Sequence, residues 1–142
     1  MDNYIINIEG LDRSGKDTLV SYIHRQTNFK YVLHPRSVLT NLVYNKMFSR
    51  PYVYDLEQYR DQVFVILDTD FEDWIVRCRN TGEKPNEGSA TLEDQYHRDS
   101  SAFEEQINFL IKEGFKVIRF NTSIQTPYMI AKQVVAYMES LE

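Results

Sequence analysis

This chain has a single cysteine, a deficit of basic residues and no long apolar segment. Cys78 is the only cysteine among 142 residues, which excludes an internal disulfide bond and a metal site built from several cysteines. The net charge is -5 and no local run of Lys and Arg occurs, whereas nucleic-acid and membrane-surface binders usually present a basic stripe. We therefore expect neither a nucleic acid nor a membrane surface as a partner.

The remaining composition is ordinary for a soluble globular protein. Apolar residues make up 42% of the chain and charged residues 26%. The sequence passes directly into its first apolar run without a basic leader or a span of membrane length, which predicts neither a signal peptide nor a membrane helix. The length predicts one domain over residues 1–142, and the lone cysteine fits a reducing cytoplasm.

The most informative stretch is Gly10–Thr18, which follows the apolar run Tyr4–Ile8 directly. It begins with a glycine and continues, after four residues, with Gly15 and Lys16, which is the spacing of a phosphate-binding loop, although Asp17 stands where Ser or Thr is usual. Glycines let the backbone wrap so that N–H groups point inward at phosphate oxygens, and the following helix directs its positive end at the same place. An ordinary strand-to-helix turn is the alternative, but the strand before the loop and the amphipathic helix after it favour a phosphate site.

Apolar periodicity predicts alternating strands and helices along the rest of the chain. Short apolar runs predict strands at residues 4–8, 31–33, 63–67 and 115–120. Apolar residues at spacings of three and four predict helices at residues 16–26, 38–48, 71–79, 91–113 and 127–141, with a loop or short helix at 56–59. Such an alternation predicts an α/β fold, with a mostly parallel sheet of about four strands flanked by helices on both sides.

Several details follow from these assignments. The helix at 91–113 should turn one face inward, made of Phe103, Ile107, Leu110 and Ile111. Pro35 should stop ladder pairing and help to fix a turn. Ligands of such sheets bind at the carboxyl ends of the strands, so residues 10–18, 34–37 and 68–70 should face one crevice.

Three blocks of the sequence resemble thymidylate kinases and related deoxynucleoside and deoxynucleotide kinases. Ile8–Thr18 is similar to the opening of that family, where a strand ends in Glu-Gly and an Asp follows two positions later. The stretch from Phe64 to Glu83 is similar to the family's strand, helix and lid, including two closely spaced arginines. Arg36-Ser37, with Asn41–Tyr44 after it, resembles the Asp-Arg-Ser segment of small phage-type members.

The resemblance implies a three-layer P-loop kinase fold with a lid at about residues 79–90. It implies ATP and Mg²⁺ as cofactors and transfer of the γ-phosphoryl group to a nucleoside monophosphate or nucleoside as the reaction. The partner would be a small-molecule nucleotide, and the location the cytoplasm, that of the host if the chain is phage-encoded. The oligomeric state is open, a homodimer included.

The resemblance also implies residue roles. Lys16 would hold the transferred phosphates, Asp12 would lie near the acceptor's sugar, and Arg36 would contact the acceptor phosphate or the transition state. Arg77 and Arg79 would be lid and adenine-side residues. The implied cofactor-binding set is Gly10, Arg13, Ser14, Gly15, Lys16, Asp17, Thr18 and Arg79, and the implied Mg²⁺ ligands are Asp17 and Asp68.

Each arginine also has a structural interpretation. Arg36 could be a salt-bridge partner at the end of a strand, and Arg77 and Arg79 could form an exposed helix face that pairs with nearby acids. Asp68 could cap the following helix or orient a metal-bound water.

The chain departs from the family in four places, which keeps a second function open. Asp17 replaces the hydroxyl, Pro35 replaces the family's aspartate, the lid segment 83–87 has only Lys84 as a cation, and the segment before residue 63 is shortened. A phosphotransferase and a nucleotide-binding but inactive protein are therefore both considered. A GTP-hydrolysing switch ranks lower because the chain lacks an Asn-Lys-x-Asp base-reading motif.

Overall fold

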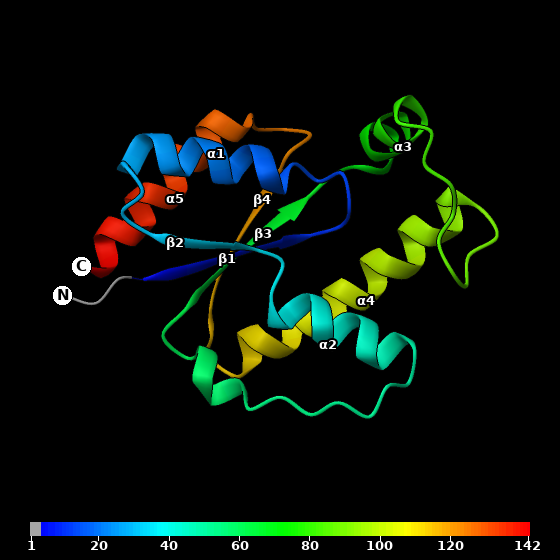
Figure 1. Cartoon of the computed structure of the whole chain (residues 1–142), viewed down its shortest axis with the longest axis horizontal. Coiled ribbons are helices and arrows are strands. Elements are labelled where there is room, and N and C mark those ends of the chain that lie inside the picture. The colour runs from blue at the N-terminus through cyan, green and yellow to red at the C-terminus, as the bar shows by residue number, and fades with distance from the viewer. Residues whose placement is uncertain (1–3) are drawn as a thin grey trace.

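A four-stranded parallel sheet forms the centre of the computed structural model, which describes residues 4–142 (Figure 1). The strands are β1 (Ile5–Gly10), β2 (Val32–Pro35), β3 (Val63–Asp68) and β4 (Lys116–Asn121), in the order β2-β1-β3-β4. The helices are α1 (Lys16–Thr27), α2 (Val38–Met47), α3 (Phe71–Asn80), α4 (Leu92–Lys112) and α5 (Pro127–Leu141), with the short 3₁₀ helix η1 (Leu56–Tyr59). The predicted α/β fold is confirmed.

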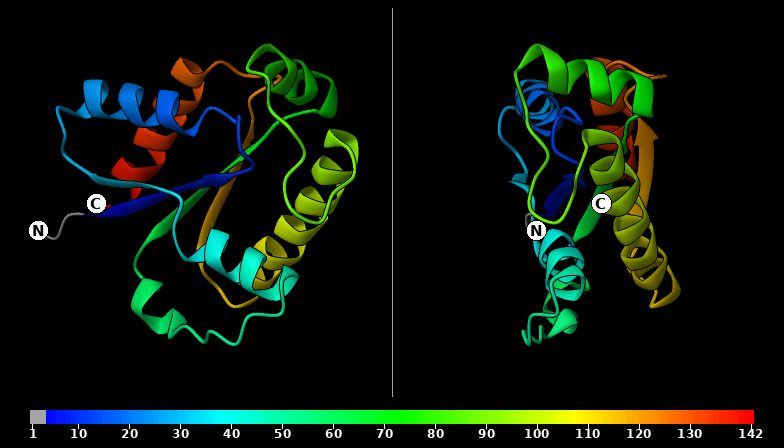
Figure 2. Two further views of the ribbon diagram at one scale, coloured as in Figure 1. Left: turned by 45° about the vertical axis from the view of Figure 1, so that its right-hand side comes forward. Right: turned by 90° about the vertical axis from the view of Figure 1, so that its right-hand side faces the viewer.

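Helices cover both faces of the sheet, which gives three layers (Figures 1 and 2). Helices α1 and α5 pack on one face through a cluster that includes Ile6, Ile8, Leu19, Ile23, Val63, Val65, Ile130 and Val134. Helices α2 and α4 pack on the other face through Leu39, Val43, Phe64, Ile66, Phe103 and Ile107. Successive side chains of a strand point to opposite faces, so a strand covered on both sides is apolar along its covered length, as β3 is from Val63 to Leu67.

Two details differ from the sequence-based prediction. Pro35 is the last residue of β2, so the ladder ends one bond later than predicted: Pro35 pairs with Ile8, and the N–H of Arg36 still donates to the Ile8 carbonyl, at 2.9 Å. Since Arg36 donates toward β1, the Pro35 nitrogen faces the open edge, where no donor is needed. Ile111 is 49% exposed because the buried stripe of α4 runs through Phe103, Ile107 and Leu110 and leaves it on the solvent side.

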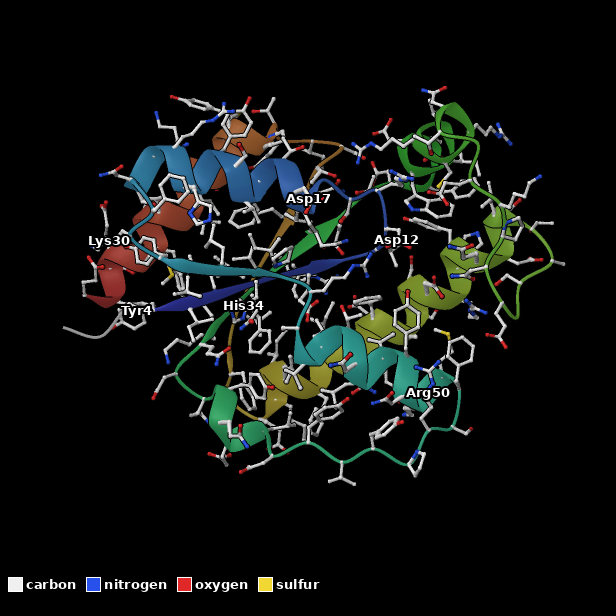
Figure 3. All side chains as sticks on the ribbon, viewed as in Figure 1. Tyr4, Asp12, Asp17, Lys30, His34 and Arg50 are labelled. Carbon is white, nitrogen blue, oxygen red and sulfur yellow. The ribbon has the colours of Figure 1, made fainter. Side chains whose placement is uncertain are left out.

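The arrangement places the sequence's polar turns at one end of the sheet. Figure 3 shows Asp12 and Asp17 at the carboxyl end of β1, with Tyr4 and Lys30 at the opposite end. No helix within residues 4–142 is long and apolar enough to cross a membrane.

Candidate functional site

The loop after β1 has a backbone that only particular residues can adopt. Gly10, Arg13 and Gly15 have φ of 149°, 64° and 96°, and the Ser14 N–H donates to the Leu11 carbonyl at 3.2 Å. A Cβ on Gly10 would lie 2.5 Å from the carbonyl oxygen of Leu67, so the close approach of β3 requires glycine there. Gly15 is the N-cap of α1 without a side-chain cap, which leaves the first N–H groups of the helix available to an anion.

Lys16 lies inside this loop. It is 7% exposed, and its Nζ donates to the carbonyls of Gly10 at 2.9 Å and Leu11 at 2.5 Å and to the Ser14 Oγ at 3.2 Å. Burial lowers the pKa of Lys16 to about 8, although the carboxylates of Glu9 and Asp17 oppose this shift. A cation therefore sits at the centre of the loop, where a phosphate could exchange places with its present acceptors.

A cavity of about 520 Å³ opens beside the loop. Its lining consists of residues 12–18, Pro35, Arg36 and, from the loop after α3, Glu83. Two of the three segments predicted to share a crevice therefore do so. The cavity brings together Asp12, Lys16 and Arg36 and most of the predicted cofactor-binding set, whereas Gly10 is not among its lining residues.

Arg36 forms an ion pair with Asp12 across this cavity. Its φ of 79° is left-handed, so the chain turns sharply as it leaves β2 and the guanidinium reaches toward the loop. The interpretation of Arg36 as a salt-bridge partner is thus confirmed; Arg36 also lines the cavity, and its contact with a phosphate stays a prediction.

Glu9 is a site residue to which the sequence interpretation gave no role. Its side chain is fully buried, and its carboxylate accepts hydrogen bonds from Ser37 Oγ at 3.0 Å, Thr40 N at 3.1 Å and Thr40 Oγ1 at 2.6 Å. Glu9 precedes Gly10 and its partner Ser37 follows Arg36, so one carboxylate joins the start of the loop to the arginine turn and to the N-terminus of α2. A charged residue at the end of an apolar strand was the signal that could have identified it.

Helix α3 holds the loop from outside. The Trp74 indole donates to the Asp12 carbonyl and the Arg77 guanidinium donates to the Arg13 carbonyl, each at 2.8 Å. Arg77 therefore reaches the predicted site, but through the loop's backbone. A second cavity, of about 450 Å³, lies between Arg13 of the loop and Arg77 and Thr81 at the end of α3.

Arg79 lies outside this arrangement. It is exposed, and it lines neither the cavity beside the loop nor the one next to α3. Two residues along a helix point in nearly opposite directions, so Arg77 and Arg79 cannot both face the loop. The structure does not bring Arg79 to the predicted cofactor site.

Asp68 is also placed away from the loop's cavity. Its two carboxylate oxygens accept from Arg119, from Nε at 3.1 Å and from Nη2 at 2.9 Å, and it lines a separate cavity of about 120 Å³ under α4. The N-cap of α3 is Asp70, so Asp68 does not cap that helix. Both oxygens of this carboxylate are thus bound by an arginine, and the role of Asp68 as a Mg²⁺ ligand stays a prediction.

Asp17 does fit a magnesium role. It is exposed and lines the loop's cavity beside Lys16. Mg²⁺ is commonly held by one or two carboxylates together with water and phosphate oxygens, so a single acid beside a phosphate site suffices. Within residues 4–142 no group of three or more His, Cys, Asp or Glu side chains forms a metal cage.

The loop after α3 rests on α4 and on the Gly10–Thr18 loop. The Asn86 N–H donates to Gln95 at 2.8 Å, and Arg98 donates to the Glu87 carbonyl and to Asn86 Oδ1, each at 2.7 Å. At its other end, Glu83 forms an ion pair with Arg13. The segment predicted as a lid is thus attached at both ends.

Comparison with known proteins supports the fold alone. No protein-family model matches this chain, and no curated protein matches its sequence. Its structure is similar to the crystal structure of the YorR protein from Bacillus subtilis in complex with phosphorylated GDP, with a TM-score of 0.76 and 17% identity over 95% of each chain. The thymidylate kinase-like family therefore stays a prediction from the sequence.

Proposed function

We propose that this chain binds a nucleoside triphosphate at the loop Gly10–Thr18 and transfers its terminal phosphoryl group to a nucleoside monophosphate or nucleoside. The convergence of Arg13, Lys16 and Arg36 on one cavity carries this proposal. Phosphoryl transfer depends on alignment and on neutralising charge on the moving oxygens, and converging cations supply both. The complex of YorR with phosphorylated GDP is a further reason to consider a nucleoside phosphate as the ligand.

The two cavities suggest how the ligands would be divided between them. The triphosphate would bind to the N–H groups of the loop and to Lys16, with its nucleoside in the cavity beside Arg77 and Thr81. The acceptor would approach from the side of Asp12 and Arg36, which form an ion pair, and Ser37, the residue after Arg36, donates a hydrogen bond to the buried Glu9. Asp17 would hold Mg²⁺, which when bound supplies positive charge to the phosphate oxygens.

A nucleotide-binding protein without catalysis is the second candidate function. Both arginines of the cavity are already paired with carboxylates, Arg13 with Glu83 and Arg36 with Asp12. The segment 81–91 has no arginine that could replace them at a transferring phosphate. A protein that retains the loop but binds its arginines internally could serve as a regulator or an assembly subunit.

One assay separates the two functions. ADP formation from ATP and Mg²⁺ would be measured with a panel of deoxynucleosides and their monophosphates, for the wild type and for Lys16→Ala. We expect turnover with at least one acceptor and its loss in the variant. ATP binding in a thermal shift assay without turnover on any acceptor would support the inactive candidate, and a lack of ATP binding would contradict both.

A further inference from the structure

A carboxylate from the lid lies inside the cavity proposed for the phosphates. The Nε of Arg13 donates to Glu83 Oε1 at 3.0 Å, and Nη2 of the same guanidinium contacts the same oxygen. Both residues line the cavity beside the loop, together with Lys16. The carboxylate of Glu83 is thus bound to the guanidinium that a polyphosphate would need.

The end of α3 fixes the position of Glu83. The Glu83 N–H donates to the Cys78 carbonyl at 2.9 Å, and the Gly82 N–H donates to the Arg79 carbonyl at 3.2 Å. With Gly82 at φ 69°, these bonds form the standard glycine stop of a helix. The end of the helix therefore fixes the backbone of Glu83 at a position from which its side chain reaches Arg13.

Glu83 belongs to a different segment of the chain from the other acids of the cavity. Asp12 and Asp17 belong to the phosphate loop, so they stay beside it whatever binds. Glu83 lies 70 positions from Arg13 in the sequence, and its side chain can leave the guanidinium by rotating about its own bonds while its backbone stays in place. A bound phosphate and the Glu83 carboxylate would need the same guanidinium, so the two compete.

We propose that Glu83 is a built-in competitor of the phosphate ligand at Arg13, which lowers the resting affinity of the site and is released when a polyphosphate binds. This inference rests on the proposed function, because it assumes that phosphates bind in this cavity. The pair is partly exposed, with 42% and 36% of the two side chains accessible, and such pairs change an equilibrium by about 1.5- to 5-fold. Removal of a negative charge beside a highly charged ligand adds to this factor.

Glu83→Gln tests the inference, with Glu87→Gln as its matched control. Both variants remove one negative charge from the same segment, but Glu87 does not line the cavity, and it contacts Arg98 through its main-chain carbonyl. Inorganic triphosphate is the probe, titrated calorimetrically. We expect Glu83→Gln to bind it about 3- to 10-fold more tightly than the wild type, and Glu87→Gln to stay within about twofold.

A double variant tests whether the gain in triphosphate affinity requires Arg13. In Arg13→Gln, the additional change Glu83→Gln should bring only the small gain from the lost negative charge, within about twofold, because no guanidinium remains to compete for. Equal triphosphate affinities of Glu83→Gln and Glu87→Gln, or a full gain in the Arg13→Gln background, would overturn the inference and leave the proposed function standing. Failure of every protein, the wild type included, to bind triphosphate or ATP would overturn both.

Discussion

The indole N–H of Trp74 donates a hydrogen bond of 2.8 Å to the main-chain carbonyl of Asp12, across a separation of 62 residues in the sequence. Trp74 is 1% exposed, and its ring lies 5.3 Å from that of Tyr96, so the donor is held rigidly. The Gly10–Thr18 loop is therefore positioned by α3 as well as by its own glycines. The conformation of a local motif depends here on a helix that follows much later in the chain.

Trp74→Phe should weaken this connection. The change removes the donor and leaves the Asp12 carbonyl without its partner, which costs about 1–3 kcal/mol of unfolding free energy. Urea denaturation followed by circular dichroism measures the cost. We also expect weaker triphosphate binding, because the loop loses its outer support.

Tyr96→Phe is the control for that experiment. It removes a buried hydrogen bond of 2.6 Å to the Thr69 carbonyl in the same aromatic cluster, without touching the loop. Its stability cost should be about 1 kcal/mol, with triphosphate affinity unchanged. Equal losses of affinity in the two variants would contradict a specific role for Trp74.

Triphosphate binding should weaken above about pH 8. The pKa of Lys16 is lowered to about 8, so the free loop loses its charge there, and a bound polyanion restores a higher pKa. Binding then takes up a proton, and the affinity should fall about tenfold between pH 8 and pH 9.5. Calorimetry in buffers of different ionisation enthalpy measures the uptake. A constant affinity over this range would contradict the role of Lys16, and Lys16→Met provides the pH-independent reference.

The lowered pKa of Lys16 should also make the folded protein more stable as the pH rises, whereas it weakens triphosphate binding. The folded pKa lies below the usual value of 10.5, so the unfolded chain binds more protons between about pH 8 and 10.5. The contribution of Lys16 to the unfolding free energy should therefore rise with pH in that window. Denaturation of the wild type and of Lys16→Met at several pH values isolates this contribution, and it would be refuted by parallel curves.

Gly10→Ala should be far more damaging than Gly82→Ala. Both positions have positive φ. A Cβ added at Gly10 would lie 2.5 Å from the Leu67 carbonyl oxygen, whereas a Cβ added at Gly82 would have no surrounding atom within 4 Å. The Gly82 change should cost about 1–2 kcal/mol from backbone strain alone, and the Gly10 change more, because β1 and β3 must separate. The unfolding free energies of the two variants would be measured by thermal and urea denaturation. Similar losses would show that the close contact is unimportant.

Thr40→Val should destabilise the junction of β1 and α2. It removes the hydroxyl that donates at 2.6 Å to the buried Glu9 carboxylate, at a cost of about 1–3 kcal/mol. Thr40→Ser keeps the donor and should retain most of the stability. If Val and Ser variants unfold alike, the hydrogen bond does not matter, and Glu9 is held by its other partners.

The sequence by itself determined the order of the elements and the place of the glycine turn between β1 and α1. Apolar spacing places each strand and helix within a few residues of its observed ends, and the spacing of Gly10, Gly15 and Lys16 fixes a local turn. These features depend on neighbours along the chain, so periodicity and glycine positions suffice to predict them.

The tertiary structure alone decided which charges meet. It paired Arg13 with Glu83, Asp12 with Arg36 and Asp68 with Arg119, and it buried Glu9 between two segments of the site. Each pair joins residues that are 24 to 70 positions apart or on different elements. Such contacts arise from the packing of α2, α3 and α4 around the sheet, and an ion pair leaves no periodic pattern in the sequence by which it could be found.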